Sequence, residues 1–284
     1  MDTATTIDGA GQGWRAELYL GCERRPGPRG PRTVLARKHQ RGPLTLQRAF
    51  HPEGAPCHLY PLHPPGGVVG GDTLDIRLSV AAGAHALVTT PGAAKFYRSA
   101  GDTARQTQVL RVESGGVLEW LPQPAILFPG ARVRAQTDIR LHGDARCIAW
   151  ELISLGRPVI GERFGHGALD AAFRLARDGR PQLAERLRVD TPADLDRGSG
   201  LRRHAVTGTF VATGAAAPDL EAAHAVVADA AAVLIGVTRL DDLLVARALA
   251  DTTEPVQRVF CALWSALRPR LLGRGAVPPG IWAT

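Results

Sequence analysis

The stretch Arg132–Leu141, with the sequence RVRAQTDIRL, carries the clearest structural signal in the chain. Small or apolar residues occupy every second position, namely Val133, Ala135, Thr137, Ile139 and Leu141. Charged or amide side chains occupy the positions between them. Because successive side chains of a β-strand point to opposite faces, this alternation predicts a strand with one buried face and one solvated face.

Other short segments with strand-like patterns, separated by Gly, Pro or Asp-Gly turns, fill the first two-thirds of the chain. Residues 74–80 alternate in the same way. The remaining candidate strands are Pro43–Phe50, His85–Thr90, Gln106–Val112, Val117–Leu121, Cys147–Ile153, Ala168–Arg177 and Gln182–Val189. Asp178-Gly179 predicts a hairpin turn between the last two. Many short strands with regular turns indicate a layered β architecture.

The last third of the chain changes to helical spacing. The apolar residues Val256, Val259, Phe260, Leu263, Trp264 and Leu267 follow one helical face. A second helix is expected over Pro218–Ala230, and Val233–Arg239 with Leu243–Leu249 is expected to form a hairpin between the two helices. We therefore predict one mainly β domain over residues 14–284, with about two α-helices in its C-terminal third, after a flexible tail of residues 1–13.

Composition fits a globular protein. The 284 residues are 45% hydrophobic and 21% charged, with 34 basic and 27 acidic residues scattered along the chain for a net charge of +7. The one dense basic stretch, Arg24–Arg32, is rich in Pro and Gly and has no aromatic residue on which a base could stack, which favours a solvated loop. A basic nucleic-acid-binding β module stays open as an alternative on the net charge alone.

The cellular compartment can be predicted from the cysteines and from the lack of a recognisable targeting signal. The four cysteines lie far apart in the sequence and form no C-x-x-C pair, which fits a reducing compartment. We find no secretory signal and no apolar stretch of membrane-spanning length. The sequence therefore predicts a soluble cytoplasmic protein without a membrane partner.

Catalytic and ligand-binding motifs are sparse. Neither a G-x-S-x-G elbow nor an H-E-x-x-H helix occurs, and the Gly-rich stretch Pro65–Asp72 lacks the Lys-Ser/Thr of a phosphate loop. Cys57, His58 and His63 lie close together and are of types that suit nickel or zinc, but they do not complete a tetrahedral set. With Asp72 they are the only support for a second alternative, a metal-dependent hydrolase on a β-sandwich.

Carboxylates near predicted strand ends could do acid–base work if two of them met. The candidates are Asp72, Glu119, Glu151 and Glu162. Sequence alone brings no two of them together, so pairing with an arginine or capping of a turn is the favoured interpretation for each. Trp120, Trp150 and Trp264 fall on apolar faces, which favours a place in the core.

Five segments, taken in order, match strings typical of one protein family. They are Cys57–Asp72 (CHLYPLHPPGGVVGGD), Thr89–Ser99 (TTPGAAKFYRS), Leu118–Gln123 (LEWLPQ), Leu263–Pro269 (LWSALRP) and Pro279–Thr284 (PGIWAT). On these residues the chain resembles the UreD (UreH) family of urease accessory proteins, over nearly all of its length after Gly13. Two positions depart from the pattern: Pro124 stands where the family usually has Glu, and Ala94 where it usually has Thr.

The resemblance implies a role rather than a reaction. UreD-like proteins are mostly β, are not enzymes, and bind apo-urease together with a helical partner, UreF. UreF recruits the GTPase UreG, which brings nickel, and the UreD-like subunit is thought to offer the metal an internal route into urease. We therefore expect a hetero-oligomer with no tightly bound cofactor, nickel in transit, and no nucleic-acid partner.

Site residues follow from the same strings. Asp72, Glu119, His58 and His63 are the candidate ligands for nickel in transit, and Asp72 is equally suited to capping a turn. The residues expected to serve partner contact or the functional motif are Gly66, Gly67, Gly70, Gly71, Lys95, Tyr97, Arg98, Trp264 and Trp282. The C-terminal helix and the Gly-rich loop are the candidate partner surfaces.

Overall fold

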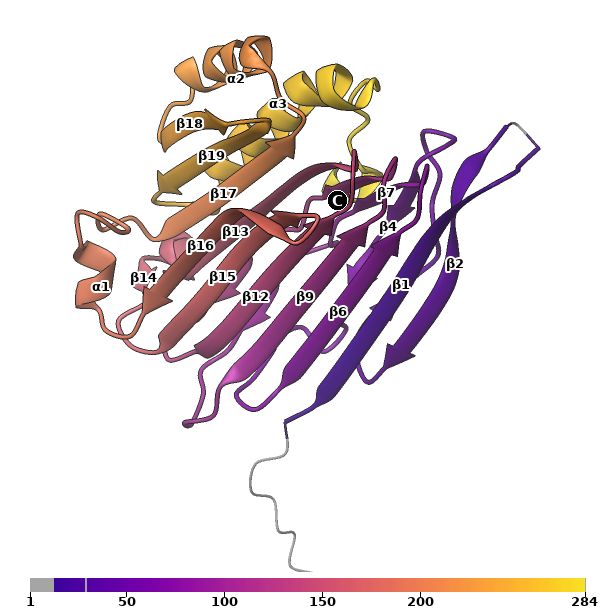
Figure 1. Cartoon of the computed structure of the whole chain (residues 1–284). Coiled ribbons are helices and arrows are strands. Elements are labelled where there is room, and N and C mark those ends of the chain that lie inside the picture. The colour runs from indigo at the N-terminus through magenta and orange to yellow at the C-terminus, as the bar shows by residue number, and fades with distance from the viewer. Residues whose placement is uncertain (1–12, 29, 284) are drawn as a thin grey trace, which may run out of the picture.

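The computed structural model describes residues 13–28 and 30–283. It is mainly β, with two large sheets packed face to face and a layer of helices on one of them (Figure 1). Among the residues described, no helix is long and apolar enough to cross a membrane. The predicted tail of residues 1–13 lies outside the described residues except for Gly13.

The first sheet has seven strands and forms the long flat face seen in Figure 1. Their spatial order is β16 (Arg180–Val189), β15 (Ala168–Arg177), β12 (Arg132–Leu141), β9 (Ala104–Val112), β6 (Thr73–Val80), β1 (Arg15–Arg25) and β2 (Arg32–Arg41). The five central strands pair in parallel, and β2 and β16 add antiparallel edges.

The second sheet has ten strands. Its main path is β18 (Leu234–Leu240), β19 (Leu243–Ala250), β17 (Val206–Thr213), β13 (Arg146–Arg157), β10 (Val117–Trp120), β7 (His85–Val88) and β4 (Cys57–Leu59). Short strands β8 (Ala94–Phe96), β11 (Ala125–Leu127) and β14 (Glu162–Arg163) attach to this path, and β3 (Thr45–Leu46) pairs separately with β5 (Pro61–Leu62).

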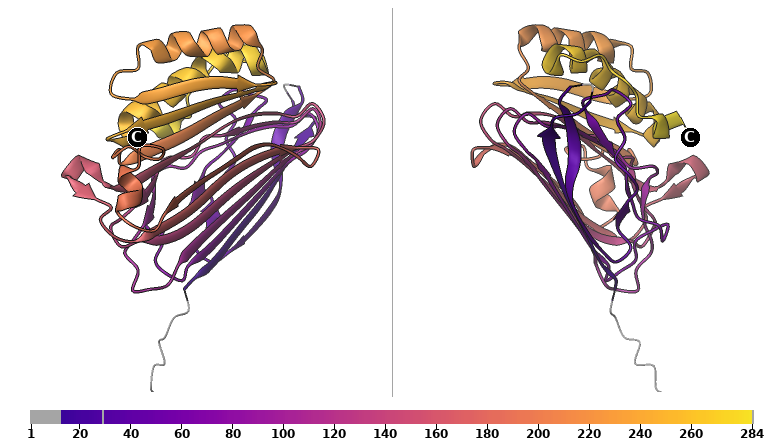
Figure 2. Two further views of the ribbon diagram at one scale, coloured as in Figure 1. Left: turned by 60° about the vertical axis from the view of Figure 1, so that its left-hand side comes forward. Right: turned by 90° about the vertical axis from the view of Figure 1, so that its right-hand side faces the viewer.

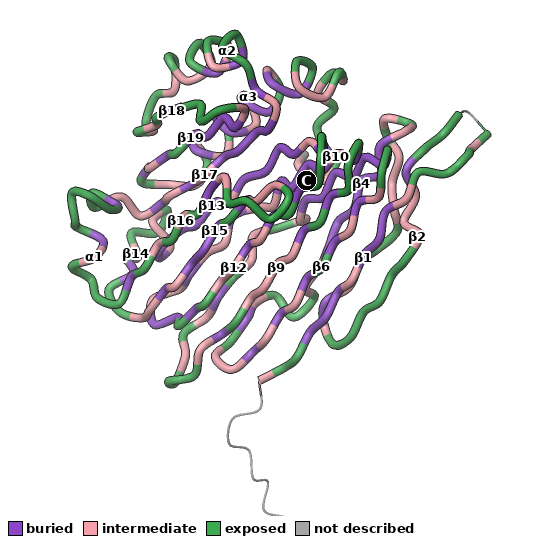
Figure 3. Tube along the Cα trace, viewed as in Figure 1, coloured by how far each residue is buried: buried purple, intermediate pink, exposed green. Residues whose placement is uncertain are grey.

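From β6 to β15 the chain passes back and forth between the two sheets. A short turn joins β6 to β7, β9 to β10, and β12 to β13. Each of these pairs has one strand in the first sheet and one in the second, and the three pairs lie side by side. This winding explains why the central strands are parallel although the turns between them are short. Side chains at alternate positions of each strand therefore meet in one core between the sheets, and the alternation of burial is visible along the strands (Figure 3).

Helices cover the far side of the second sheet (Figure 2). α2 (Ala217–Ala228) and α3 (Thr253–Leu272) pack on each other, and α3 also contacts β13, β17 and β19. A second core, built around the side chains of Trp150, Phe210, Phe260 and Trp264, fills the space beneath them. The remaining helices are short: α1 (Ala193–Asp196), η1 (Pro158–Ile160) and η2 (Gly280–Ala283).

The predicted fold class is confirmed: the chain is mainly β, and its two long helices lie in the C-terminal third. The hairpin at Asp178-Gly179 also forms, with φ of 49° and 76° at the two turn residues. The strand predicted over Pro43–Phe50 is wrong for most of its length, because only β3 and an isolated bridge between Phe50 and His58 pair there. The β3 partner Pro61 has no N–H to continue the ladder. Strands β1, β2 and β17 were not predicted.

Candidate functional site

A cluster of charged side chains is buried where α3 meets the second sheet. Arg268 of α3 and Glu119 of β10 are both 0% exposed at the side chain, and Glu53 is 5% exposed. The Nε of Arg268 lies 2.9 Å from Oε2 of Glu119, and its Nη2 lies 3.0 Å from Oε1. The same guanidinium donates to Glu53 through Nη1 at 2.7 Å and Nη2 at 2.8 Å. One arginine thus joins two carboxylates from distant parts of the chain.

Two histidines and a tryptophan complete this group. Nε2 of His85 lies 2.6 Å from Oε1 of Glu119, and Nε2 of His58 lies 2.7 Å from Oε1 of Glu53. Trp264 donates its indole N–H to Oε2 of Glu119 at 2.5 Å. We call Glu53, His58, His85, Glu119 and Arg268 the buried charge cluster.

The surroundings of Glu53, Glu119 and Arg268 favour the ionised form of each of these three groups. Burial alone would raise the pKa of Glu119, but the hydrogen bonds and charges of His85 and Arg268 outweigh it and hold the pKa below its usual value. Burial is likewise outweighed at Glu53, where His58 and Arg268 lower the pKa to about 2. At Arg268 the two carboxylates outweigh burial and raise the pKa. The cluster therefore fixes the end of α3 against β10 through paired charges.

The two C-terminal tryptophans lie beside this cluster. The rings of Trp264 and Trp282 meet edge to face with centroids 5.7 Å apart. Trp282 donates its indole N–H to Oγ1 of Thr89 at 2.9 Å, and Thr89 in turn donates to the carbonyl of Leu121 at 2.6 Å. Trp264 is fully buried. Both tryptophans thus pack α3 and the C-terminal segment against the second sheet.

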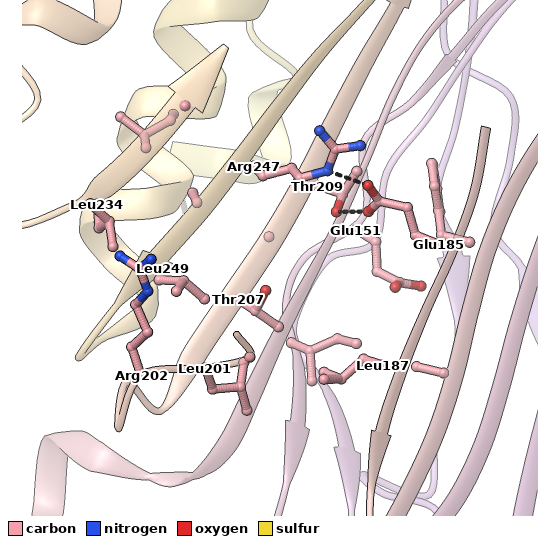
Figure 4. Close-up of a pocket in the computed structure, with 18 of the residues that line it drawn as sticks. Glu151, Glu185, Leu187, Leu201, Arg202, Thr207, Thr209, Leu234, Arg247 and Leu249 are labelled. Atoms are coloured by element: carbon pink, nitrogen blue, oxygen red, sulfur yellow. Dashed lines mark hydrogen bonds and ion pairs between the residues drawn. The ribbon is translucent and has the colours of Figure 1, made fainter. Parts of the chain in front are cut away.

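A cavity of about 710 Å³ lies between β15 and β16 of the first sheet and β17, β18 and β19 of the second. Glu185 reaches across it: its Oε2 accepts a hydrogen bond from Oγ1 of Thr209 at 2.6 Å, and its Oε1 pairs with Nε of Arg247 (Figure 4). Glu151 lines the same cavity, and its carboxylate forms no ion pair with the residues that the structure describes. We call this space the first cavity.

A second cavity, of about 320 Å³, adjoins the first, because Glu151 lines both. Its wall includes His63, Gly66, Gly67 and Lys95, which are four of the residues singled out from the sequence. Burial lowers the pKa of His63, and the charge of Asp72 opposes that shift. The two cavities form adjoining spaces between the sheets, with one carboxylate at their common boundary.

Glu151 has an unusual protonation equilibrium for a carboxyl group. Burial, followed by the charge of Glu185, raises the pKa of Glu151 to about 7, although a hydrogen bond with Thr137 works in the opposite direction. The group therefore changes charge near neutral pH. A carboxyl group with this property, lining a cavity, is a candidate for proton-coupled binding of a cation.

The Gly-rich segment is held by Asp72 as a capped turn. Oδ1 of Asp72 accepts the backbone N–H of Trp14 at 2.7 Å, and Oδ2 accepts that of Val69 at 3.0 Å. At Gly67 a Cβ would lie 2.1 Å from the ring of Tyr97, so only glycine fits there. The structure thus places Asp72 as a turn cap and Tyr97 as packing for the glycines.

The remaining predicted residues of these strings are spread around the same turn. Gly66 and Gly71 have φ of 79° and 90°, and a Cβ at Gly70 would lie 2.3 Å from Oγ of Ser99. Arg98 packs its side chain near Gly130. These contacts explain the local conformation of the Gly-rich loop.

The candidate metal ligands from the sequence do not meet. His58 faces Glu53 in the buried charge cluster, His63 lines the second cavity, and Cys57 is buried in β4. Within residues 13–28 and 30–283, no group of three or more His, Cys, Asp or Glu side chains is placed to hold a metal ion. Glu119, another candidate, is fully used by Arg268, His85 and Trp264.

Sequence reasoning missed Arg268, Glu53 and Glu185. Arg268 follows Trp264 by four residues, so it falls on the apolar face of α3, and a charged residue there signals a buried partner. Glu53 lies in an irregular segment with no pattern to mark it. Glu151 was noted as a carboxylate near a strand end, but nothing in its neighbours indicated Glu185, which comes from the other sheet.

Comparison with known proteins gives a consistent result. A family model described as "UreD urease accessory protein" matches residues 15–283. A protein of Alcanivorax borkumensis named "Urease accessory protein UreD" is 49% identical over 97% of this chain and 94% of its own length. Proteins of the same name from Pseudomonas entomophila and Aliivibrio fischeri are 44% and 39% identical, and the aligned regions cover 97% and 98% of this chain and 96% and 99% of theirs.

Proposed function

Because this chain belongs to the UreD family of urease accessory proteins, we propose that it is a non-catalytic scaffold that binds apo-urease and helps deliver nickel into the urease active site. Its proposed partners are a UreF-type accessory protein and a UreG-type GTPase, in a cytoplasmic hetero-oligomer. Residues 14–284 would act as one folded unit. Family membership favours this role over a metal-dependent hydrolase or a nucleic-acid-binding module.

The observation that carries the nickel part of the proposal is the pair of adjoining cavities that share Glu151. They provide a sheltered space between the sheets in which a divalent cation could pass from one side of Glu151 to the other. The polar groups along this space include the carboxylates of Glu151 and Glu185, the hydroxyl of Thr209 and the imidazole of His63.

These ligands suit transit better than storage. Nickel binds imidazole and thiolate groups firmly, whereas isolated carboxylates and hydroxyls hold it weakly. In the first cavity Glu185 is already paired with Arg247 and Thr209, which leaves Glu151 as the carboxylate available to a cation. A single carboxylate with few further ligands would bind nickel briefly and release it.

Binding at Glu151 would also be coupled to a proton. With a pKa of about 7, a substantial fraction of Glu151 is protonated at neutral pH, and an arriving cation must displace that proton. Nickel occupancy of the cavity should therefore rise between about pH 6 and pH 8, as the carboxylate ionises.

The role is tested by genetic complementation. The gene for this chain is deleted while the urease operon is left intact, and the cells are supplied with nickel. Both the activity and the nickel content of purified urease are then measured. Inactive, nickel-poor urease that is restored by the gene in trans is the expected result. Fully active urease in the deletion strain would refute the accessory role.

A further inference from the structure

A strongly basic groove lies on the outer face of the seven-stranded sheet, on the side that faces away from the second sheet. Its volume is about 600 Å³, and the cationic side chains along it are Arg37, Arg77, Arg111 and Arg140, with His39 beside them. The side chain of Lys38 points to the opposite face of the sheet, where its Nζ donates to the carbonyl of Leu46 at 2.9 Å. No Asp or Glu is among the described residues that line it. We call this surface the basic groove.

The strand register explains why the groove is hollow. Gly21 of β1 pairs with Arg37 of β2 on one side and with Ser79 of β6 on the other, so two small residues form the floor. A Cβ at Gly21 would lie only 2.9 Å from Nε of Arg37, which shows how closely that side chain leans over the glycine. Glycine within a strand often marks a place where another group approaches the backbone.

At the end of the groove formed by β9 and β12, two positive side chains have few carboxylates near them. Arg111 of β9 stands directly beside Arg140 of β12 in the parallel register, about 4.8 Å away at the backbone. Arg140 has one carboxylate, that of Asp138, at the limit of 4.0 Å, and Asp138 is shared with Arg174 at 3.5 Å. Arg111 has no ion pair or side-chain hydrogen bond among residues 13–28 and 30–283.

Such a pair of adjacent like charges destabilises a sheet unless an anion lies between them. The nearby carboxylates are already engaged. Glu23 pairs with Arg25 at 3.0 Å and lies 3.8 Å from Arg37. Asp75 pairs with Arg77 at 2.7 Å, and Glu17 lies 3.7 Å from His39. Arg111 is therefore left without a carboxylate partner among the described residues, and Arg140 has only the one at 4.0 Å, so a carboxylate from another molecule could bind between them.

We propose that the basic groove docks an acidic segment of a protein partner, through carboxylates that bind Arg111, Arg140 and Arg37. Guanidinium groups form paired hydrogen bonds with carboxylates, which provides both energy and orientation. The span from Arg37 to Arg140 crosses four strand spacings, or about 19 Å, which an extended segment of about six residues covers. This inference does not depend on the nickel route.

Two features of the groove argue against nucleic acid as the occupant. Tyr19 is the aromatic side chain that lines the groove, and its ring is already in contact with the guanidinium of Arg77 at 4.8 Å and with the ring of His39 at 5.2 Å. It is therefore poorly placed to stack on a base. The floor is made of strands whose backbone N–H groups serve the sheet ladder, so it offers no nest of free N–H groups for a phosphate.

The test measures binding of the purified full chain to a fluorescent oligoglutamate of about eight residues, with oligoglutamine of the same length as the neutral probe. The Arg111→Gln/Arg140→Gln variant is compared with Arg105→Gln/Arg134→Gln. The control variant removes the same charge from the same two strands, where Arg105 and Arg134 also stand side by side.

Oligoglutamate should bind more weakly as salt is added, and the groove variant should bind it about tenfold more weakly than the control variant does. Thermal melting should show the groove variant to be at least as stable as the natural chain, since a like-charge pair is removed. Arg111→Glu, which can pair with Arg140, should also lose binding while staying folded.

Equal loss of binding in the groove and control variants would overturn the proposal, because it would mean that net charge alone attracts the probe. Tighter binding of single-stranded DNA or of tripolyphosphate than of oligoglutamate, lost in the same groove variant, would overturn the choice of an acidic protein segment.

Discussion

Replacing Arg268 by Met should destabilise the protein more than any surface substitution. The change leaves Glu119, with 0% of its side chain exposed, and Glu53, with 5% exposed, without the guanidinium that joins them. Removing one partner of a buried ion pair costs about 3–5 kcal/mol, because the remaining charge stays buried. Protonation of one carboxyl group would limit the loss, so values near the lower end are expected at low pH.

The assay is urea denaturation followed by circular dichroism and tryptophan fluorescence. The control is Arg258→Met on the same helix, where Arg258 pairs with Glu254 and both side chains are more than two-thirds exposed, at 73% and 79%. Arg268→Met should also lower the melting temperature by about 10 °C, on the scale of roughly 2–4 °C per kcal/mol.

A triple variant sharpens this prediction. Arg268→Met combined with Glu53→Gln and Glu119→Gln removes the whole set of fixed charges, and it should recover most of the lost stability. The reasoning is refuted if Arg268→Met is no less stable than Arg258→Met, or if the triple variant is no more stable than the single one.

Three further predictions concern Glu151, Glu53 and Gly67. Burial raises the pKa of Glu151 from 4.5 to about 7, so ionisation of this carboxyl group costs the folded state up to about 3 kcal/mol. Glu151→Gln should therefore raise the free energy of unfolding by about 1–2 kcal/mol at pH 8. This gain should shrink as the pH falls toward 4.5. Glu53 behaves in the opposite way, because its pKa is lowered from 4.5 to about 2. Its contribution to stability is full above pH 4.5 and is lost as the pH drops toward 2. Between these pH values, the free energy of unfolding of Glu53→Gln should therefore depend less steeply on pH than that of the natural chain. Gly67→Ala places a methyl group 2.1 Å from the ring of Tyr97 and should lower the melting temperature, whereas Gly92→Ala in open space should not; equal effects would contradict the packing described.

The strands and the long helices could be predicted from the sequence because their side-chain periods are regular. Arg132–Leu141 and Ala168–Arg177 have the predicted bounds. β1 was not predicted, although Ala16, Leu18, Leu20 and Cys22 occupy every second position there as well, so its pattern could have been recognised. The winding between two sheets could not be predicted, since it depends on which strands pair across the chain rather than on the pattern within any one strand.

The site was less accessible to sequence reasoning. His58 and Glu119 were identified as candidate ligands, but they belong to the buried charge cluster, because Arg268 arrives from 149 residues further along the chain. Asp72 was expected either to line a bend or to cap a turn, and its two backbone hydrogen bonds place it as a cap. A residue's partners decide its chemistry, and those partners come from other strands and from the last helix.

Glu151 also illustrates a compromise between stability and function. A carboxyl group whose ionised form is disfavoured by burial and by Glu185 reduces stability at neutral pH. Proteins keep such groups where the charge is used. If nickel passes Glu151, the ionised carboxylate serves nickel delivery although it lowers stability. Glu151→Gln should then both stabilise the protein and impair nickel delivery to urease.

The most direct test of the central claim is therefore the nickel content of urease purified from cells in which the deleted gene is replaced by Glu151→Gln, with Glu221→Gln on the exposed side of α2 as the matched control. Co-purification of the variant with urease shows whether the assembly still forms. The account predicts normal co-purification but nickel-poor, weakly active urease with Glu151→Gln, and normal nickel with Glu221→Gln. Fully loaded urease with Glu151→Gln would contradict a route for nickel past this carboxylate.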